Sequence, residues 1–365
     1  MVFLTVGIVT AAWAPLVPEV KLRLGLDDAA LGAAMLGFGA GALAGTLLAG
    51  RLAQRFGCRS VIMAGGFLFC ALLPAVALAP SVAVLATLLV CFGATLATVD
   101  VAMNAQAVAI ERATGRTRMS GFHGLFSLGG LLGVGTISAL LAVGGPAAGA
   151  AATVGLAGAT LLVAAAPALL PAAPIAATSL ARPHGKLLLI GALCFISFLA
   201  EGAMLDWSAV LLRLHRGAGA GEAGMGYAAF SVAMAGMRLS GDALARRFGS
   251  VVLVRGGAVV AAGGFFLCGA VDSAAAGIAG GALAGFGCAN MVPQLFAAAG
   301  RLPGVAPGPA ISAVAAPGYV GMLAGPGLIG FAATSVGLPV ALLGVAGLLL
   351  VVLLFAHMVG DGHDG

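Results

Sequence analysis

Charged side chains are scarce in this chain of 365 residues: Asp, Glu, Lys and Arg together make up 8% of it, against 61% hydrophobic residues. A soluble protein of this length needs a polar shell, which so few charges cannot provide. Most of the surface is therefore expected to face lipid. Lipid offers the backbone no hydrogen bonds, so a chain crosses it as helices or as a closed barrel. Barrel strands alternate apolar and polar residues, whereas the apolar runs here are uniform over ~20 residues, which indicates helices.

The sequence also lacks the motifs of several enzyme classes. It contains no P-loop, HExxH or GxSxG pattern, and no YD and GxGD pair of intramembrane aspartates. We therefore expect no enzyme, no metal and no cofactor. The six cysteines show no CxxC spacing and are interpreted as packing residues. They are Cys58 in a predicted loop and Cys70, Cys91, Cys194, Cys268 and Cys288 within apolar runs.

Apolar runs separated by Gly, Pro and charged residues predict twelve transmembrane helices. They lie at roughly 2–20, 29–49, 61–79, 82–106, 120–143, 147–171, 187–211, 224–240, 252–271, 275–298, 309–333 and 337–358. The first run has neither a basic start nor a small-residue cleavage site, so it is interpreted as a membrane helix and not as a signal peptide. The 59 glycines suit helices that pack closely in a membrane.

The basic residues predict the orientation. With the N-terminus inside, four of the 17 Lys and Arg residues fall on the outer side, namely Lys21, Arg23, Arg213 and Arg216, which leaves thirteen on the inner side. This bias places both termini in the cytoplasm. It also accounts for the net charge of +5 without a nucleic-acid partner.

Two similar halves are predicted from internal repeats. LAQRFG at 52–57 follows the second span and LARRFG at 244–249 follows the eighth, while DVAMNAQ at 100–106 corresponds to NMVPQLF at 290–296. Repeats that are six spans apart keep the same orientation, as in two-lobed secondary transporters. A Pro- and Ala-rich stretch is interpreted as the linker between the halves. The expected division is a lobe over 1–171, a cytoplasmic linker over 172–186 and a lobe over 187–365.

At these residues the chain resembles the major facilitator superfamily. The family's loop motif G-x-L-x-D-R-x-G-[RK] resembles GRLAQRFGCR at 50–59, in which Gly50, Leu52, Arg55 and Gly57 match, Gln54 stands in place of the acid and the basic residue, Arg59, comes one position later. The resemblance covers the whole chain and implies an all-α membrane protein with twelve helices in two six-helix lobes.

Within that family the chain resembles the fucose and glucose/galactose proton symporters and uncharacterised bacterial inner-membrane members of that type. Their acid and Asn on helix four are matched by Asp100 and Asn104, their Glu on helix seven by Glu201, and their Asn and Pro on helix ten by Asn290 and Pro293. The resemblance implies a sugar-like solute and the bacterial inner membrane. The second acid that those symporters carry inside helix one is missing here, which does not support a two-acid relay.

Asp100 and Glu201 are the candidate proton-coupling residues. An ionised side chain that faces lipid costs ~3 kcal/mol or more, so both are expected to face the interior of the bundle. A secluded carboxyl group there can bind and release a proton. The alternatives are a structural acid that pairs with a neighbouring donor and a hydrogen bond that locks two helices.

The candidate solute-binding residues are amides, aromatic residues and one histidine. Amides offer both donors and acceptors to neutral polyols, and aromatic faces stack on sugar rings. They are Asn104, Asn290, Gln294, Trp13, Tyr319 and His123, of which the histidine could also serve gating or proton passage. Interhelical hydrogen bonding and core packing are the structural alternatives.

The candidate gating residues are Arg55, Arg59, Arg238 and Asp242, which lie near predicted inner helix ends. Alternating access needs inner contacts that form in one state and break in the other. The alternative is that these residues only set the topology.

Taken together, the sequence predicts a monomeric secondary transporter that moves a sugar or similar polyol with protons by alternating access. A drug or metabolite exporter that uses proton antiport is the alternative, although 6% aromatic residues argue against a cavity for lipophilic cations. A transporter-like sensor is a further alternative. Membrane lipids and the solute are the expected partners.

Overall fold

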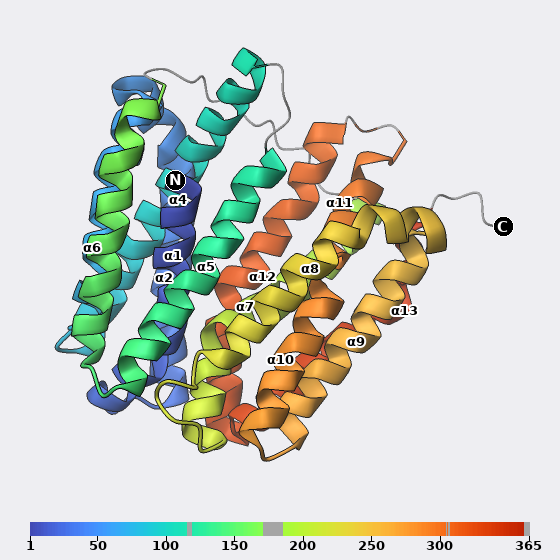
Figure 1. The fold of residues 1–365 in the computed structure, drawn as a ribbon. Helices are drawn as coiled ribbons and strands as arrows, with labels where there is room; N and C mark the ends of the chain where they lie inside the picture. The colour runs from blue at the N-terminus through green and yellow to red at the C-terminus, as the bar shows by residue number, and fades with distance from the viewer. Residues whose placement is uncertain (115–118, 171–184, 304, 306, 361–365) are drawn as a thin grey trace. The chain divides into compact units, whose positions relative to one another are not determined.

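The computed structural model describes residues 1–114, 119–170, 185–303, 305 and 307–360, and every regular element in these ranges is a helix (Figure 1). The first six spans are α1 (Val2–Leu24), α2 (Asp28–Phe56), α3 (Cys58–Ala77), α4 (Val82–Thr114), α5 (Met119–Ala142) and α6 (Ala147–Ala165). The others are α7 (Lys186–Val210), α8 (Met225–Phe248), α9 (Ser250–Ala270), α10 (Ala274–Cys288), α11 (Met291–Gly300), α12 (Pro307–Val336) and α13 (Leu338–Phe355). Short 3-10 turns follow α6 and α13, and a π-turn, Leu211–His215, follows α7.

The twelve predicted spans are confirmed, with α10 and α11 together forming the tenth. Eleven segments of the described chain are long and apolar enough to cross a membrane, and α8 is not among them. Its 24 residues are sufficient in length, but Arg238, Arg246 and Arg247 make it more polar than the rest.

Three helices extend well beyond their predicted ends. α2 continues to Phe56, α4 to Thr114 and α8 to Phe248, because a helix that leaves the membrane needs no apolar residues to keep its backbone bonded. Both α2 and α8 stop at a glycine with positive φ, Gly57 at 80° and Gly249 at 82°, a conformation that other residues rarely adopt. Two predictions are thereby corrected. Arg238 lies well inside α8 and not at its end, and Cys58 is the first residue of α3 and not a loop residue.

The chain divides into two compact units. Unit 1 comprises Met1–Ala177 and Ala218–Gly224, and unit 2 comprises Thr178–Gly217 and Met225–Gly365. Most of the predicted linker, 172–186, lies outside the described residues.

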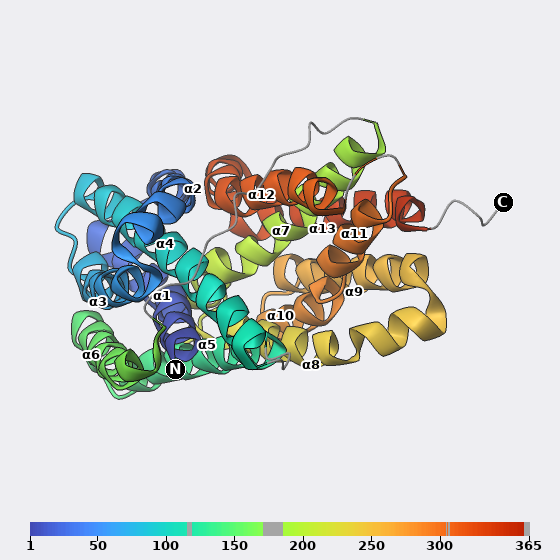
Figure 2. The same cartoon turned by 90° about the horizontal axis from the view of Figure 1, so that it is seen from above.

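Glycines bring the helices of each unit into close contact. In unit 1, a Cβ at Gly41 of α2 would collide with the carbonyl of Val90 on α4. In unit 2, a Cβ at Gly264 of α9 would collide with the backbone of α10 at Ala284. Figure 2 shows these two pairs, α2 beside α4 and α9 beside α10. Since lipid tails are as apolar as the helices, such close backbone packing is a main source of helix association.

Two of the basic residues that were predicted to lie on the outer side have a structural role that the two units share. Arg23, at the end of α1, donates from Nη1 to the carbonyl of Ala79 beyond α3, at 2.6 Å. Arg216, beyond α7, donates from Nη2 to the carbonyls of Cys268 and Gly269 at the end of α9, at 2.8 and 3.0 Å. Both arginines therefore satisfy carbonyls that a helix C-terminus leaves without partners.

Candidate functional site

Asp100 lies on α4 in unit 1 and is half-buried. Asn104, one turn later, donates from Nδ2 to the backbone carbonyl of Asp100 at 2.9 Å and to its carboxyl oxygen Oδ1 at 3.3 Å. The two side chains predicted to share a face therefore contact each other. Among the described side chains of unit 1, no Lys or Arg forms an ion pair with Asp100.

His123 is the titratable residue that the fold brings toward Asp100. It lies on α5, exposed, and is close enough to Asp100 for the two to interact electrostatically. Its ring meets the ring of Phe3 edge-on, with centroids 5.4 Å apart. Asp100, Asn104 and His123 thus form one polar group in unit 1, contributed by α4 and α5. An acid held by an amide, without a fixed cation in the described structure, can change its charge without breaking an ion pair.

The other predicted residues of unit 1 lie elsewhere. Trp13 is buried in α1, with 4% of its surface exposed, as expected of a packing residue. Arg55 and Arg59 are exposed on either side of Gly57, and the guanidinium of Arg55 lies over the ring of Phe56 at 5.2 Å from its centroid. Gating by these two arginines stays a prediction.

Glu201 on α7 and Arg238 on α8 form the corresponding charged group of unit 2. Arg238 Nη2 and Glu201 Oε2 are 3.5 Å apart, and the side chains are 46% and 12% exposed. The other carboxyl oxygen, Oε1, is buried and accepts no hydrogen bond from any described residue. Arg238, predicted to be a gating residue, therefore pairs with the predicted proton-coupling acid of its own unit.

A break between α10 and α11 provides the second partner of Arg238. Pro293 has no N–H to donate to the carbonyl of Ala289 four residues earlier, and its ring would clash with that carbonyl in a regular helix. The helix is accordingly interrupted at Ala289 and Asn290. Arg238 donates from Nε to the freed Ala289 carbonyl at 3.2 Å, which replaces the missing backbone bond.

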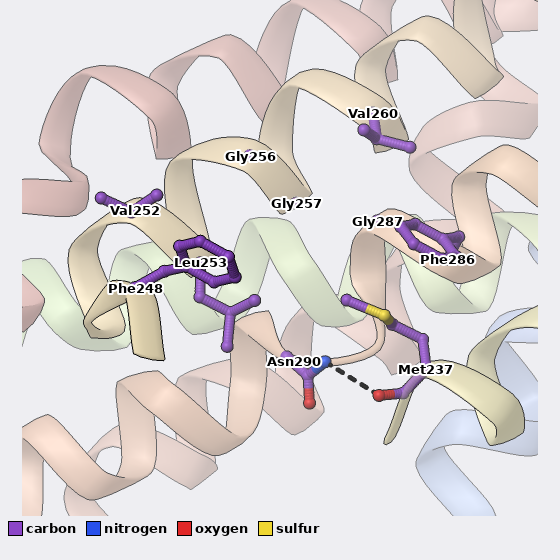
Figure 3. Close-up of a pocket in the computed structure, with 10 residues that line it drawn as sticks. All are labelled: Met237, Phe248, Val252, Leu253, Gly256, Gly257, Val260, Phe286, Gly287 and Asn290. Carbon is purple, nitrogen blue, oxygen red and sulfur yellow. Dashed lines mark hydrogen bonds between the residues drawn. The ribbon is translucent and has the colours of Figure 1, made fainter. Parts of the chain in front are cut away.

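The predicted amides of unit 2 connect helices at this break. Asn290 donates from Nδ2 to the carbonyl of Met237 on α8 at 3.2 Å (Figure 3). Gln294 on α11 accepts from Ser250 Oγ on α9 at 2.7 Å. Both amides are almost fully buried. They make the interhelical bonds that were the alternative to solute binding, and their binding of solute stays a prediction.

A crevice of about 200 Å³ opens beside Asn290 (Figure 3). Its lining is apolar apart from that amide: Met237, Phe248, Val252, Leu253, Gly256, Gly257, Val260, Phe286, Gly287 and Asn290. Neither Glu201 nor Arg238 belongs to it. The crevice therefore does not provide the polar surroundings that a polyol requires.

The remaining predicted residues of unit 2 are Tyr319 and Asp242. Tyr319 is exposed on α12, and its ring is tilted against Phe198 with centroids 5.4 Å apart. The side chain of Asp242 lies outside the described structure, so its predicted gating role is not addressed.

Tyr227 and Ser231 were missed in the sequence. Their side chains are hydrogen-bonded on α8, and Tyr227 interacts electrostatically with Glu201, Asp206 and Arg238. The spacing of positions 227, 231 and 238 in the sequence could have indicated this cluster, because it places all three on one face of a helix.

Comparison with known proteins bears on the whole chain. Residues 1–308 match the family model of the Major Facilitator Superfamily. An uncharacterised MFS-type transporter of Yersinia pestis is 45% identical over 361 residues, covering 98% of this chain and 94% of the relative. Membrane protein MosC of Rhizobium meliloti is 33% identical over 341 residues, covering 92% and 83%. The crystal structure of the nucleoside transporter NupG superposes with a TM-score of 0.77 at 14% identity, covering 98% and 97%, which shows a shared fold.

Proposed function

Because the chain belongs to the Major Facilitator Superfamily and is thus a multi-pass membrane transporter and not an enzyme, we propose that it moves a small polar solute together with protons by alternating access. In this mechanism the proton-binding group must affect the relative stability of the inward-facing and outward-facing states. The membrane potential supplies ~2.3 kcal/mol per charge per 100 mV.

The state of Asp100 is the observation that carries the proposal. It is half-buried in a membrane helix and is held by Asn104 and not by a described cation. An ionised carboxyl group in a membrane helix is costly, which favours a functional role. Glu201 is the second candidate proton carrier. It differs in that protonation would also weaken its ion pair with Arg238.

The proposed solute is a sugar or a similar polyol. The support is the match of Asp100, Asn104, Glu201 and Asn290 to positions of the fucose and glucose/galactose symporters, the branch to which we assign the chain. NupG, a nucleoside transporter, shares the fold, so nucleosides belong in any panel of test solutes. The exposed guanidinium of Arg238 disfavours the alternative, an exporter of lipophilic cations.

The proposed location is the bacterial inner membrane, with both termini in the cytoplasm and the protein acting as a monomer. The distribution of Lys and Arg between the two sides of the membrane supports the cytoplasmic termini, and the resemblance to bacterial inner-membrane members of the family supports the location.

The test is solute uptake into proteoliposomes under an imposed proton gradient, screened over sugars, polyols and nucleosides. Asp100→Asn is expected to abolish accumulation against a gradient while solute exchange at equal concentrations persists, because the amide can still hydrogen-bond but cannot carry a proton. Asp272→Asn is the matched control, since the side chain of Asp272 is 86% exposed. Undiminished gradient-driven accumulation by Asp100→Asn would remove Asp100 as the coupling residue.

A further inference from the structure

Among the described residues, Arg238 and Glu201 form an ion pair in which neither side chain uses all of its hydrogen-bonding capacity. Their separation of 3.5 Å exceeds the roughly 2.7–2.9 Å of a charge-assisted hydrogen bond. Arg238 donates from Nε to the carbonyl of Ala289, and with 46% of its side chain exposed it has further donors for an incoming group. Glu201 Oε1 is buried without a donor in the described structure.

The break in the tenth span holds the guanidinium in this position. Pro293 leaves the carbonyl of Ala289 without a backbone donor, and the bond from Arg238 Nε to that oxygen fixes one edge of the guanidinium. Asn290 anchors the same turn of α8 through the carbonyl of Met237. The guanidinium is thus positioned on its scaffold while its outer edge remains accessible, which is the arrangement of a preformed binding group.

We infer that Arg238 binds a carboxylate of the transported solute, which is then a polyol that carries an acid group. This inference rests on the proposed transport function and narrows its substrate class. A carboxylate matches the planar guanidinium through two parallel N–H···O bonds, whereas a neutral hydroxyl compensates little of the positive charge.

The pairing with Glu201 links this site to protons. An ionised Glu201 competes with the solute for Arg238 and repels its carboxylate, and a proton on Glu201 removes both effects. Tyr227 and Arg238 face Glu201 from α8 and Cys288 faces it from α10. The helices α11, α12 and α13 carry no Asp, Glu, Lys, Arg or His. Asp206 lies on the same helix as Glu201 and interacts electrostatically with Tyr227.

The test measures binding by the purified full-length protein in detergent. Acidic and neutral compounds are compared in pairs, glucuronate with glucose and gluconate with sorbitol, through the Kd and the ligand-induced shift of the unfolding midpoint. The acids are expected to bind wild type more tightly than their neutral counterparts. Arg238→Gln is expected to weaken acid binding about tenfold or more, and Arg238→Lys less, because an ammonium group cannot pair bidentately.

Glu201→Gln is the decisive second variant, because it imitates the protonated acid and is expected to tighten acid binding. Opposite effects at the two positions cannot arise from misfolding. Three results would each overturn the inference. They are equal affinities for acids and neutral compounds, no binding of any acid at millimolar concentrations, and acid binding that is unchanged in Arg238→Gln. Proton-driven uptake of neutral polyols alone would also overturn it but would retain the proposed function. Acid binding without gradient-driven uptake would retain the binding site at Arg238 but overturn the proposed proton-coupled transport.

Discussion

The fourth span of unit 1 runs unbroken through Asp100 as part of α4, whereas its counterpart in unit 2 is divided between α10 and α11 at Asn290. The two stretches align as DVAMNAQ and NMVPQLF, so Asp100 corresponds to Asn290 and Met103 to Pro293. Unit 2 therefore has Asn290, an amide, where unit 1 has the acid Asp100. It also has Pro293 where unit 1 has Met103, and the proline lacks the backbone N–H that would bond the carbonyl four residues earlier.

Arg238 donates a hydrogen bond to the carbonyl that Pro293 frees, that of Ala289. Aligning LAQRFG with LARRFG makes Thr46 of α2 the counterpart of Arg238. Among the described residues, Thr46 bonds within its own helix, from Oγ1 to the carbonyl of Ala42 at 2.9 Å. The difference shows how one repeat yields two kinds of polar site, an acid with an amide in unit 1 and an acid with an arginine in unit 2. On our two proposals, the first binds the proton and the second the carboxylate of the solute.

Met103→Pro would impose the break of unit 2 on unit 1, and it has the largest expected effect on stability. The carbonyl of Val99 would lose its donor, and Thr46 cannot replace it as Arg238 does for Ala289. We expect the free energy of unfolding, measured by denaturant titration in detergent, to fall by about 3 kcal/mol or more.

Met103→Leu is the matched control for this variant, because it keeps the volume of a buried side chain and should cost under about 1.5 kcal/mol. Adding Thr46→Arg to Met103→Pro should recover part of the loss. A proline variant as stable as wild type would show that α4 does not depend on the bond to Val99.

The arginine caps Arg23 and Arg216 allow a second comparison between the units. The side chain of Arg216 is almost buried and donates to three carbonyls, two of them at the end of α9, with Asp272 3.2 Å from its guanidinium. Arg23 donates to one carbonyl from an exposed position. We expect Arg216→Gln to lower the free energy of unfolding by about 2 kcal/mol and Arg23→Gln by about 1 kcal/mol or less. Arg59→Gln, at an exposed site, serves as the control. Equal losses at Arg23 and Arg216 would contradict the view that buried carbonyl contacts determine the effect.

Much of the fold could be predicted from the sequence, because long apolar runs and rare charges are strong signals in a membrane protein. The ends of α2, α4 and α8 could not, since a helical turn in water has no apolar signature. The same error made Arg238 look like a residue at a helix end. Its pairing with Glu201 depends on how α7 packs against α8, which no local pattern records. The Asn-Pro pair at 290–293 was noticed, but the carbonyl that it frees is visible only in three dimensions.

The smallest expected effect concerns a feature that the two units share. Arg55 lies over Phe56 and Arg247 over Phe248, each with 5.2 Å between the guanidinium carbon and the ring centroid. Exposed contacts of this kind contribute about 0.5–1 kcal/mol, so Arg55→Gln and Arg247→Gln should each lower the free energy of unfolding by that amount and by equal amounts. Measuring uptake beside stability tests the predicted gating role. If Arg55 takes part in gating, Arg55→Gln will slow uptake several-fold at nearly unchanged stability. Equal small effects of both variants on uptake would instead leave Arg55 with a role in topology and in the contact with Phe56 alone.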